Sequence, residues 1–255
     1  MYTLYYSPGA ASLAVHWLLL ELDVPHRLEK VDLDGGQQRS EEYLRLNPNG
    51  RVPTLVVDGR PMYECAALML LLPDRHPDAA FAPNVESPER ESYYQWIVHL
   101  ANTLQPAFRA WFYADEPAGR GQEDAVQARA RETIERSFDH LDAHLGAGGP
   151  YVTGTQISAA DIYAGMLMRW SRNMPKPATQ WPHLAALAKR LKARVTFKTL
   201  YQREGLTDCH PFAENVFTRI SDLTRHEHRL STWNEDRIAR PERHILRERP
   251  GLQAP

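Results

Sequence analysis

The sequence has few cysteines, no long apolar run and no excess of charge of either sign. Its two cysteines, Cys65 and Cys209, are too few for a disulfide framework. The longest apolar stretch, roughly residues 66–73, is far shorter than the about 20 residues that a membrane span needs. A net charge of −2 favours neither a nucleic acid nor an anionic membrane as a partner.

The first residues also lack a basic segment followed by an apolar core, so no signal peptide is predicted. We therefore expect a cytoplasmic protein. What the sequence does contain is 43% hydrophobic residues in a chain of 255, which supports a packed globule of one large or two ordinary domains.

The first half alternates between strand and helix patterns in the order βαβα and then ββα. The spacing of apolar residues, and the turn-forming residues between them, place these elements at residues 2–6, 12–22, 27–33, 40–46, 54–57, 60–63 and 64 onward. Ser12 and Ser40 are expected to cap their helices. Asp58-Gly59 between two strand-forming runs predicts a hairpin. This order predicts an α/β, thioredoxin-like domain with a mixed four-stranded sheet.

The second half carries helical patterns only. They cover residues 88–113, 123–145, 158–172, 182–194 and 196–204, and Pro106 should kink or divide the first. We expect a domain at residues 1–76, a proline-rich linker at 77–87 and an all-α domain at 88–205. Residues 206–255 are expected to form a charged extension that is either partly disordered or packed back on the domain, where it could cap the substrate cleft.

A capping box marks the start of the third helical pattern. Ser158 stands three residues before Asp161, whose carboxylate can accept from the Ser158 amide. Ile157 and Ile162 flank the pair as a hydrophobic staple. This helix is therefore expected to lie in the core.

Two short motifs suggest a site for a small peptide acid. Val52-Pro53 opens a strand, where a proline without an amide proton is tolerated. A cis bond there would turn the Val52 backbone outward, free to pair with an extended ligand. Glu64-Cys65 starts a helix, where a carboxylate can take an ammonium group and the first amides can take a carboxylate. The alternative for Glu64 is an ordinary acidic helix start.

Four motifs together resemble the cytosolic glutathione transferases, nearest to the bacterial beta-type branch. These motifs lie at residues 5–9, 47–53, 64–68 and 158–161, and the resemblance covers about residues 1–205. It implies a thioredoxin-like domain followed by a helical domain, usually in a homodimer. It also implies glutathione as the co-substrate, with no metal.

By position, the resemblance assigns the parts of glutathione to individual residues. Val52 would pair its backbone with the cysteinyl unit, next to a cis Pro53. Glu64 and Cys65 would hold the γ-glutamyl amine and carboxylate. Candidates for the glycyl carboxylate are Arg51 and Gln37. The chain departs from the beta-type pattern by carrying Ala11 in place of a cysteine and Gln105-Pro106 in place of a histidine-lysine pair.

Catalysis would require the glutathione thiol to ionise, because the thiolate is the nucleophile. Two hydroxyls are candidates to donate a hydrogen bond to the sulfur, Ser12 at a helix start and Tyr6 before Ser7-Pro8. The first-turn amides of the Ser12 helix would assist them. The alternatives are a plain helix cap for Ser12 and a packed strand aromatic for Tyr6.

The expected activity is conjugation of glutathione to small hydrophobic electrophiles, as in detoxification. The acceptor would bind against the first long helix, and its candidate residues are His99, Asn102, Phe108, Trp111 and Tyr113. One alternative is a non-catalytic binding or stress protein of the same fold. Another is a glutathione-dependent thiol transferase or peroxidase that uses Cys65, since a helix N-terminus can lower the pKa of a thiol.

Overall fold

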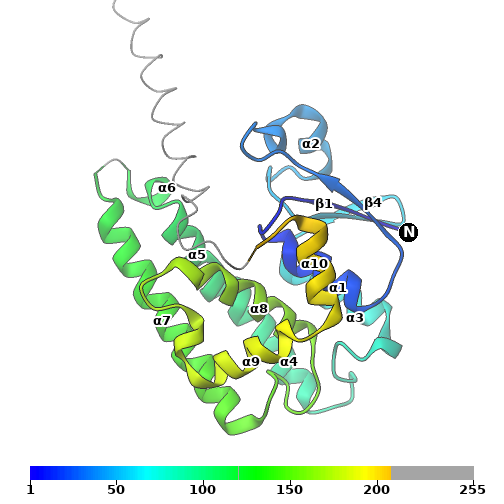
Figure 1. The fold of residues 1–255 in the computed structure, drawn as a ribbon. Coiled ribbons are helices and arrows are strands. Elements are labelled where there is room, and N and C mark those ends of the chain that lie inside the picture. Colours follow the sequence, from blue (N-terminus) through cyan, green and yellow to red (C-terminus); the bar gives the residue numbers. More distant parts are fainter. Residues whose placement is uncertain (120, 208–255) are drawn as a thin grey trace, which may run out of the picture. The chain divides into compact units, whose positions relative to one another are not determined.

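The computed structural model describes residues 1–119 and 121–207 (Figure 1). All of these residues belong to one compact unit. The predicted extension at residues 206–255 lies almost wholly outside the described residues. No helix within the described ranges is both long and apolar enough to cross a membrane.

The N-terminal domain is built on a mixed four-stranded sheet, as predicted. Its strands are β1 (Tyr2–Tyr6), β2 (His26–Lys30), β3 (Thr54–Val57) and β4 (Arg60–Tyr63), in the order β2-β1-β3-β4. β1 pairs in parallel with β2, while the β1–β3 and β3–β4 pairs are antiparallel. The predicted second strand, residues 27–33, is shifted and shorter in the structure.

Helices cover the sheet because alternate strand residues are apolar. The helices of this domain are α1 (Ser12–Glu21), α2 (Glu41–Leu46) and α3 (Cys65–Arg75), with a 3-10 turn at Gln37–Arg39. Leu4 and Leu55 of the sheet are buried in one core with Leu18 of α1 and Leu68 of α3. A smaller cluster joins Val31, Tyr43 and Val52. The element order βαβα followed by ββα is confirmed.

The prediction that Ser12 caps α1 is wrong. The cap residue is Ala11, and no side chain caps the helix. The Ser12 hydroxyl instead closes the preceding turn, since it accepts from the Ser7 amide and donates to the Ser7 carbonyl, both at 3.1 Å. At α2 the prediction is confirmed, because Ser40 Oγ accepts from the Tyr43 amide at 3.2 Å.

The C-terminal domain is helical, as predicted. Its helices are α4 (Glu89–His99), α5 (Gln105–Phe112), α6 (Asp115–Ala118), α7 (Glu123–Gly148), α8 (Ala159–Trp170), α9 (Pro182–Lys192) and α10 (Val195–Glu204). Short 3-10 turns lie at Pro77–Ala79, Ser171–Asn173 and Ala178–Gln180. A π-helical segment, Leu100–Leu104, separates α4 from α5, so the predicted division near Pro106 is confirmed. The domain boundaries at residues 76, 87 and 205 stay predictions.

The capping box of α8 is present. Asp161 accepts from the Ser158 amide at 2.8 Å, from the Ser158 hydroxyl at 2.9 Å and from the Val152 amide at 2.8 Å. Ile162 is fully buried, and Ile157 packs against the same core. Burial of Asp161 raises its pKa to about 6, although these three hydrogen bonds favour the charged form. The bonds thus compensate only part of the cost of burying the charge.

Helix α10 lies antiparallel to α1 and joins the two domains (Figure 1). At one end, Arg194 donates two hydrogen bonds to Glu21 of α1, at 2.5 and 2.6 Å. At the other end, the buried carboxylate of Glu204 accepts from the Gly9 amide at 2.9 Å and contacts His16 Nδ1 at 2.8 Å. The helical domain therefore holds the turn that precedes α1.

Candidate active site

The register of the sheet brings three site residues to one edge. Tyr5 pairs with Thr54, and Thr54 pairs with Tyr63. The next residues outward, Tyr6, Pro53 and Glu64, therefore lie at the same end of three neighbouring strands. The Val52–Pro53 bond is cis, as predicted.

The backbone of Val52 is open to a ligand at this edge. Within residues 1–119 and 121–207, neither its amide nor its carbonyl has a backbone hydrogen-bond partner. Its neighbours are fixed, because the Arg51 carbonyl accepts from the Tyr43 hydroxyl and from Asn47 Nδ2, both at 2.8 Å. Tyr43 and Thr54 are further joined at 2.9 Å. Val52 therefore offers two free backbone groups, as expected from the sequence. The hydrogen bonds of Tyr43 and Asn47 that support it were not identified in the sequence analysis.

Glu64 stands just before α3 in an unusual conformation. Its φ of 73° lies in a region that non-glycine residues rarely adopt. The side chain is exposed, and Asn49 Nδ2 donates to it at 3.5 Å. The Glu64 side chain does not cap α3, so the first-turn amides of this helix are available to an anion.

The geometry of Cys65 does not favour the alternative of a reactive thiol. The residue is only 4% exposed, and its Sγ donates to the Ala11 carbonyl at 3.4 Å. Burial, with a further contribution from Glu64, raises the pKa of the Cys65 thiol far above its ordinary value. Burial and the raised pKa therefore weigh against the alternative of a thiol transferase or peroxidase that uses Cys65. The contact with Ala11 instead shows that the N-termini of α3 and α1 adjoin.

The N-terminus of α1 also has open amides. Among the described residues, the amides of Ala11 and Ser12 have no backbone acceptor, and no side chain caps the helix. The Ser12 hydroxyl, by contrast, is buried and its proton is donated to the Ser7 carbonyl. This geometry favours the amides over the hydroxyl as donors at this point of the site.

Tyr6 is packed into the interior. Its ring lies 6.0 Å from the His16 ring, centroid to centroid, and belongs to the main core cluster. Burial and the nearby carboxylate of Glu204 raise the pKa of the Tyr6 hydroxyl. The packed-aromatic interpretation therefore has the stronger geometric support.

The two candidates for the glycyl carboxylate are both exposed. Gln37 uses its side-chain oxygen to accept from the Asp32 amide at 2.8 Å, which leaves its amide nitrogen for a ligand. The Arg51 side chain is exposed beyond its fixed carbonyl. Their assignment stays a prediction.

Two of the predicted acceptor-site residues pack within the helical domain. Phe108 is fully buried in the helical core against Phe138. His99 faces α7, where its Nε2 lies 2.7 Å from the Ser137 hydroxyl. For Phe108 and His99 the geometry favours packing between helices, and their acceptor-site assignment stays a prediction. The side chain of Asn102 is exposed, and those of Trp111 and Tyr113 are half-buried.

Tyr163 and Gln105 form a hydrogen-bonded pair that the sequence analysis did not identify. The Tyr163 hydroxyl of α8 donates to Gln105 Oε1 at the start of α5. Tyr163 also lies beside Cys65, close enough for each group to influence the pKa of the other. In the sequence, Gln105 was noted only as a departure from the beta-type pattern. Tyr163 carried no signal, because its contact depends on the packing of three helices.

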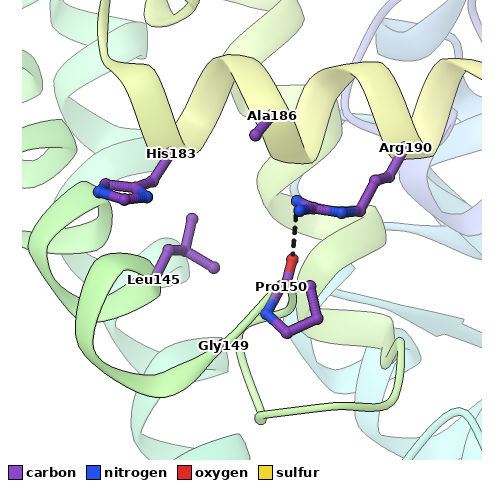
Figure 2. A pocket seen from close by; sticks show the side chains of 6 residues that line it. All are labelled: Leu145, Gly149, Pro150, His183, Ala186 and Arg190. Carbon is purple, nitrogen blue, oxygen red and sulfur yellow. Dashed lines mark hydrogen bonds between the residues drawn. The ribbon is translucent and has the colours of Figure 1, made fainter.

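Two clefts of the structure lie away from these residues. One, of about 210 Å³, is lined by α7, α9 and the loop between α7 and α8 (Figure 2), and Arg190 donates to the Pro150 carbonyl at 3.5 Å across it. The other, of about 710 Å³, is formed by residues 80–92 and 144–158. Neither contains a predicted site residue. The described part of the chain also holds no group of three or more acidic, histidine or cysteine side chains suited to a metal.

The mixed sheet, the open Val52 backbone and the helical domain define a two-domain protein that can hold a small peptide at adjoining helix N-termini. The family described as glutathione S-transferase, N-terminal domain, matches residues 10–75, and its C-terminal counterpart matches residues 124–192. Glutathione S-transferase GST-4.5 from Xanthomonas campestris pv. campestris is 31% identical over 207 residues, which are 80% of this chain and 98% of that relative.

Solved structures agree with the family match. The bacterial beta class glutathione S-transferase of Sphingomonas chungbukensis is 29% identical, with a TM-score of 0.71 over 80% of this chain and 100% of the other. A glutathione transferase homolog from Sulfitobacter with bound glutathione is 25% identical, with a TM-score of 0.75 over 81% and 99% of the chains. The chain belongs to the glutathione S-transferase family, near its bacterial beta-type branch, and is a glutathione transferase.

Proposed function

We propose that this enzyme ionises the thiol of glutathione and joins it to small hydrophobic electrophiles. The observation that carries the proposal is the meeting of two uncapped helix N-termini, joined by the 3.4 Å contact between Cys65 Sγ and the Ala11 carbonyl. Each N-terminus favours an anion through its free amides and its dipole. Glutathione offers one anion to each, a γ-glutamyl carboxylate and a thiolate.

The tripeptide is expected to lie extended along the sheet edge. Val52 pairs its amide and carbonyl with the cysteinyl unit, in the manner of an added strand. The Glu64 carboxylate takes the γ-glutamyl ammonium, and the first amides of α3 take the carboxylate beside it. Arg51 and Gln37 receive the glycyl carboxylate at the other end of the ligand.

Thiol activation is assigned mainly to the N-terminus of α1. Lowering the pKa of the thiol by about two units needs roughly 2.7 kcal/mol of differential stabilisation. Charge-assisted hydrogen bonds contribute about 1.5–3 kcal/mol each. The amides of Ala11 and Ser12 are therefore sufficient in number. The hydroxyls of Ser12 and Tyr6 remain candidate donors, but Ser12 must first release the Ser7 carbonyl.

The electrophile is expected to bind beside the sulfur, against the partly exposed side of α5 near Asn102 and Trp111. We further propose that the enzyme acts in the cytoplasm as a homodimer and serves detoxification. The balanced charge of the chain is consistent with this location.

A paired assay tests the proposal. The protein should be retained on immobilised glutathione, be eluted by free glutathione and turn over a generic aryl halide. A variant with Glu64→Ala should be retained less well. Failure of the wild-type protein to bind glutathione would contradict the proposal.

A second function has its own supporting observation. The Ser12 hydroxyl is committed to Ser7, and residue 11 is an alanine without any polar side chain. These features favour a non-catalytic glutathione-binding or stress protein. Binding without turnover in the paired assay would select this function.

A further inference from the structure

Arg169, near the end of α8, is a half-buried arginine without an acidic partner among residues 1–119 and 121–207. The other buried or half-buried arginines in these ranges all pair with a carboxylate, in the pairs Arg90–Asp74, Arg109–Glu116, Arg131–Glu135 and Arg194–Glu21. Arg169 Nε donates instead to the neutral Tyr201 hydroxyl of α10, at 2.9 Å. A guanidinium keeps its charge in a protein, so Arg169 carries a positive charge that no ion pair within these ranges neutralises.

The outer part of this guanidinium is accessible. Tyr201 occupies Nε, and Nη1 and Nη2 have no hydrogen-bond partner among the described residues. Neither atom is one of the enclosed unpaired atoms of these residues, so solvent reaches both. Two parallel N–H groups of a guanidinium match the two oxygens of a carboxylate. Arg169 therefore presents a fork of free donors that Tyr201 holds at its base.

Arg169 lies beside the turn that leads into α1. Its Nη1 is 3.1 Å from the point where a Cβ on Gly9 would lie. Because Gly9 has no side chain, the guanidinium can approach the backbone of the turn closely. Gly9 stands two residues before Ala11, and two residues span at most about 7 Å. The guanidinium is therefore close enough to the free amide of Ala11 for one small molecule to reach both.

The same turn adjoins an aromatic surface. Trp170, the next residue of α8, donates from Nε1 to the Gly9 carbonyl at 2.9 Å. Its ring meets the ring of Phe112, the last residue of α5, edge-on with the centroids 6.2 Å apart. Both aromatic side chains are half-buried and so keep part of their surface exposed. An apolar surface with one charged group beside it is typical of a site for a small molecule.

We propose that the electrophile carries a carboxylate, which Nη1 and Nη2 of Arg169 bind while its apolar part lies against Phe112 and Trp170. The inference rests on the proposed function, because it takes the thiolate to lie at the free amides of Ala11 and Ser12. It names the substrate class of that function as small aromatic electrophiles with one negative charge. Arg169 is then a specificity-determining residue that contacts the substrate away from the reacting carbon.

The reaction balances with glutathione as the only co-reactant. The thiol proton passes to solvent as the thiolate forms. With 4-chloro-3-nitrobenzoate, the sulfur lone pair forms a bond to the ring carbon that carries chlorine. The carbon–chlorine bond breaks, and chloride leaves with its electron pair. The carboxylate is unchanged and stays on Arg169.

Two probes of the same shape isolate the effect of the charge. The first is 4-chloro-3-nitrobenzoate, and the second is 4-chloro-3-nitrobenzamide, whose carboxamide is neutral and of nearly the same size. Each kcat/KM is divided by the rate constant of the uncatalysed reaction with glutathione thiolate, which corrects for the different reactivity of the two rings. The wild-type enzyme should favour the carboxylate about 10-fold or more on this scale, because a charge-assisted bidentate pair is stronger than a neutral hydrogen bond. An equal or reversed preference would overturn the proposal.

Substitutions assign the preference to Arg169. Arg169→Gln removes the charge and should reduce the carboxylate-to-carboxamide ratio about 10-fold, mainly through the KM for the carboxylate. Arg169→Lys keeps the charge without the fork and should retain part of the ratio. Arg136→Gln is the matched control, because it removes one exposed arginine from α7 and should leave the ratio unchanged. If Arg169 only supports the turn at Gly9, Arg169→Gln lowers both rates by the same factor, and that result would overturn the proposal.

Inhibition of the wild-type enzyme tests the proposal even where a variant does not fold. The probes are 3-nitrobenzoate and 3-nitrobenzamide, which lack a leaving group and compete with the electrophile. The benzoate should inhibit about 10-fold more strongly than the benzamide, and added salt should weaken only the benzoate. Equal inhibition by the two compounds would contradict the role of Arg169.

The outcomes separate this inference from the function on which it rests. Turnover of 4-chloro-3-nitrobenzamide without any preference for the benzoate overturns the role of Arg169 and leaves the proposed function intact. No turnover of either probe, together with a bound glutathione thiol whose pKa equals that of free glutathione, overturns both.

Discussion

Glu204 is expected to be among the most important single side chains for joining the two domains. Its buried carboxylate accepts from the Gly9 amide at 2.9 Å and contacts His16 Nδ1 at 2.8 Å. Glu204→Ala would leave the buried His16 ring and the amide of half-buried Gly9 without this partner. Each unsatisfied group costs about 1–3 kcal/mol, and breaking a buried pair typically costs about 3–5 kcal/mol. We expect the free energy of unfolding to fall by about 3–4 kcal/mol.

Urea unfolding followed by tryptophan fluorescence measures this loss. Glu204→Gln keeps one acceptor oxygen in nearly the same place, so it should recover about half of the loss. Glu132→Ala is the control, because Glu132 pairs with Arg129 on the surface and its removal should change little. A loss below about 1 kcal/mol in Glu204→Ala would refute the reasoning, since it would mean that water or another group replaces the carboxylate.

Three further outcomes are expected. Glu64→Ala should raise the KM for glutathione about 10-fold or more and leave kcat within about threefold, because the charge contacts the ligand away from the thiol; a fall in kcat alone would contradict this. In a Cys209→Ser background, Cys65 should resist iodoacetamide at pH 8 in the native state and react in urea, because it is buried with a raised pKa. Asp161 has a folded pKa of about 6 against an unfolded value of about 3.9, so the folded state binds the proton more tightly. Wild-type stability should therefore decline relative to Asp161→Asn as the pH rises from about 4 to 6, and parallel curves in urea unfolding would exclude the shift.

Local sequence signals predicted much of the fold. Asp58-Gly59 alone fixes the hairpin between β3 and β4, because few residue pairs adopt its backbone conformation. The capping box at Ser158 and Asp161 needs only a spacing of three residues. The open edge at Val52 was predicted for the same reason, since Pro53 restricts its neighbours in any context.

The errors arose where tertiary contacts override a local pattern. Ser12 follows a turn, and its hydroxyl accepts from the Ser7 amide and donates to the Ser7 carbonyl. Cys65 stands at a helix N-terminus, which alone would lower its pKa, but burial beside Tyr163 reverses the direction. Tyr163 is almost one hundred residues away in the sequence, so no local pattern reports that contact. The role of Glu204 at the Gly9 turn was hidden for the same reason.

The central claim is that adjoining helix N-termini ionise the thiol of bound glutathione. The most direct measurement is a pH titration of thiolate absorbance with the wild-type enzyme at saturating glutathione. The free thiol has a pKa of about 8.5, and the account predicts a value about two units lower in the complex. A bound thiol that titrates at the value of free glutathione would contradict the account.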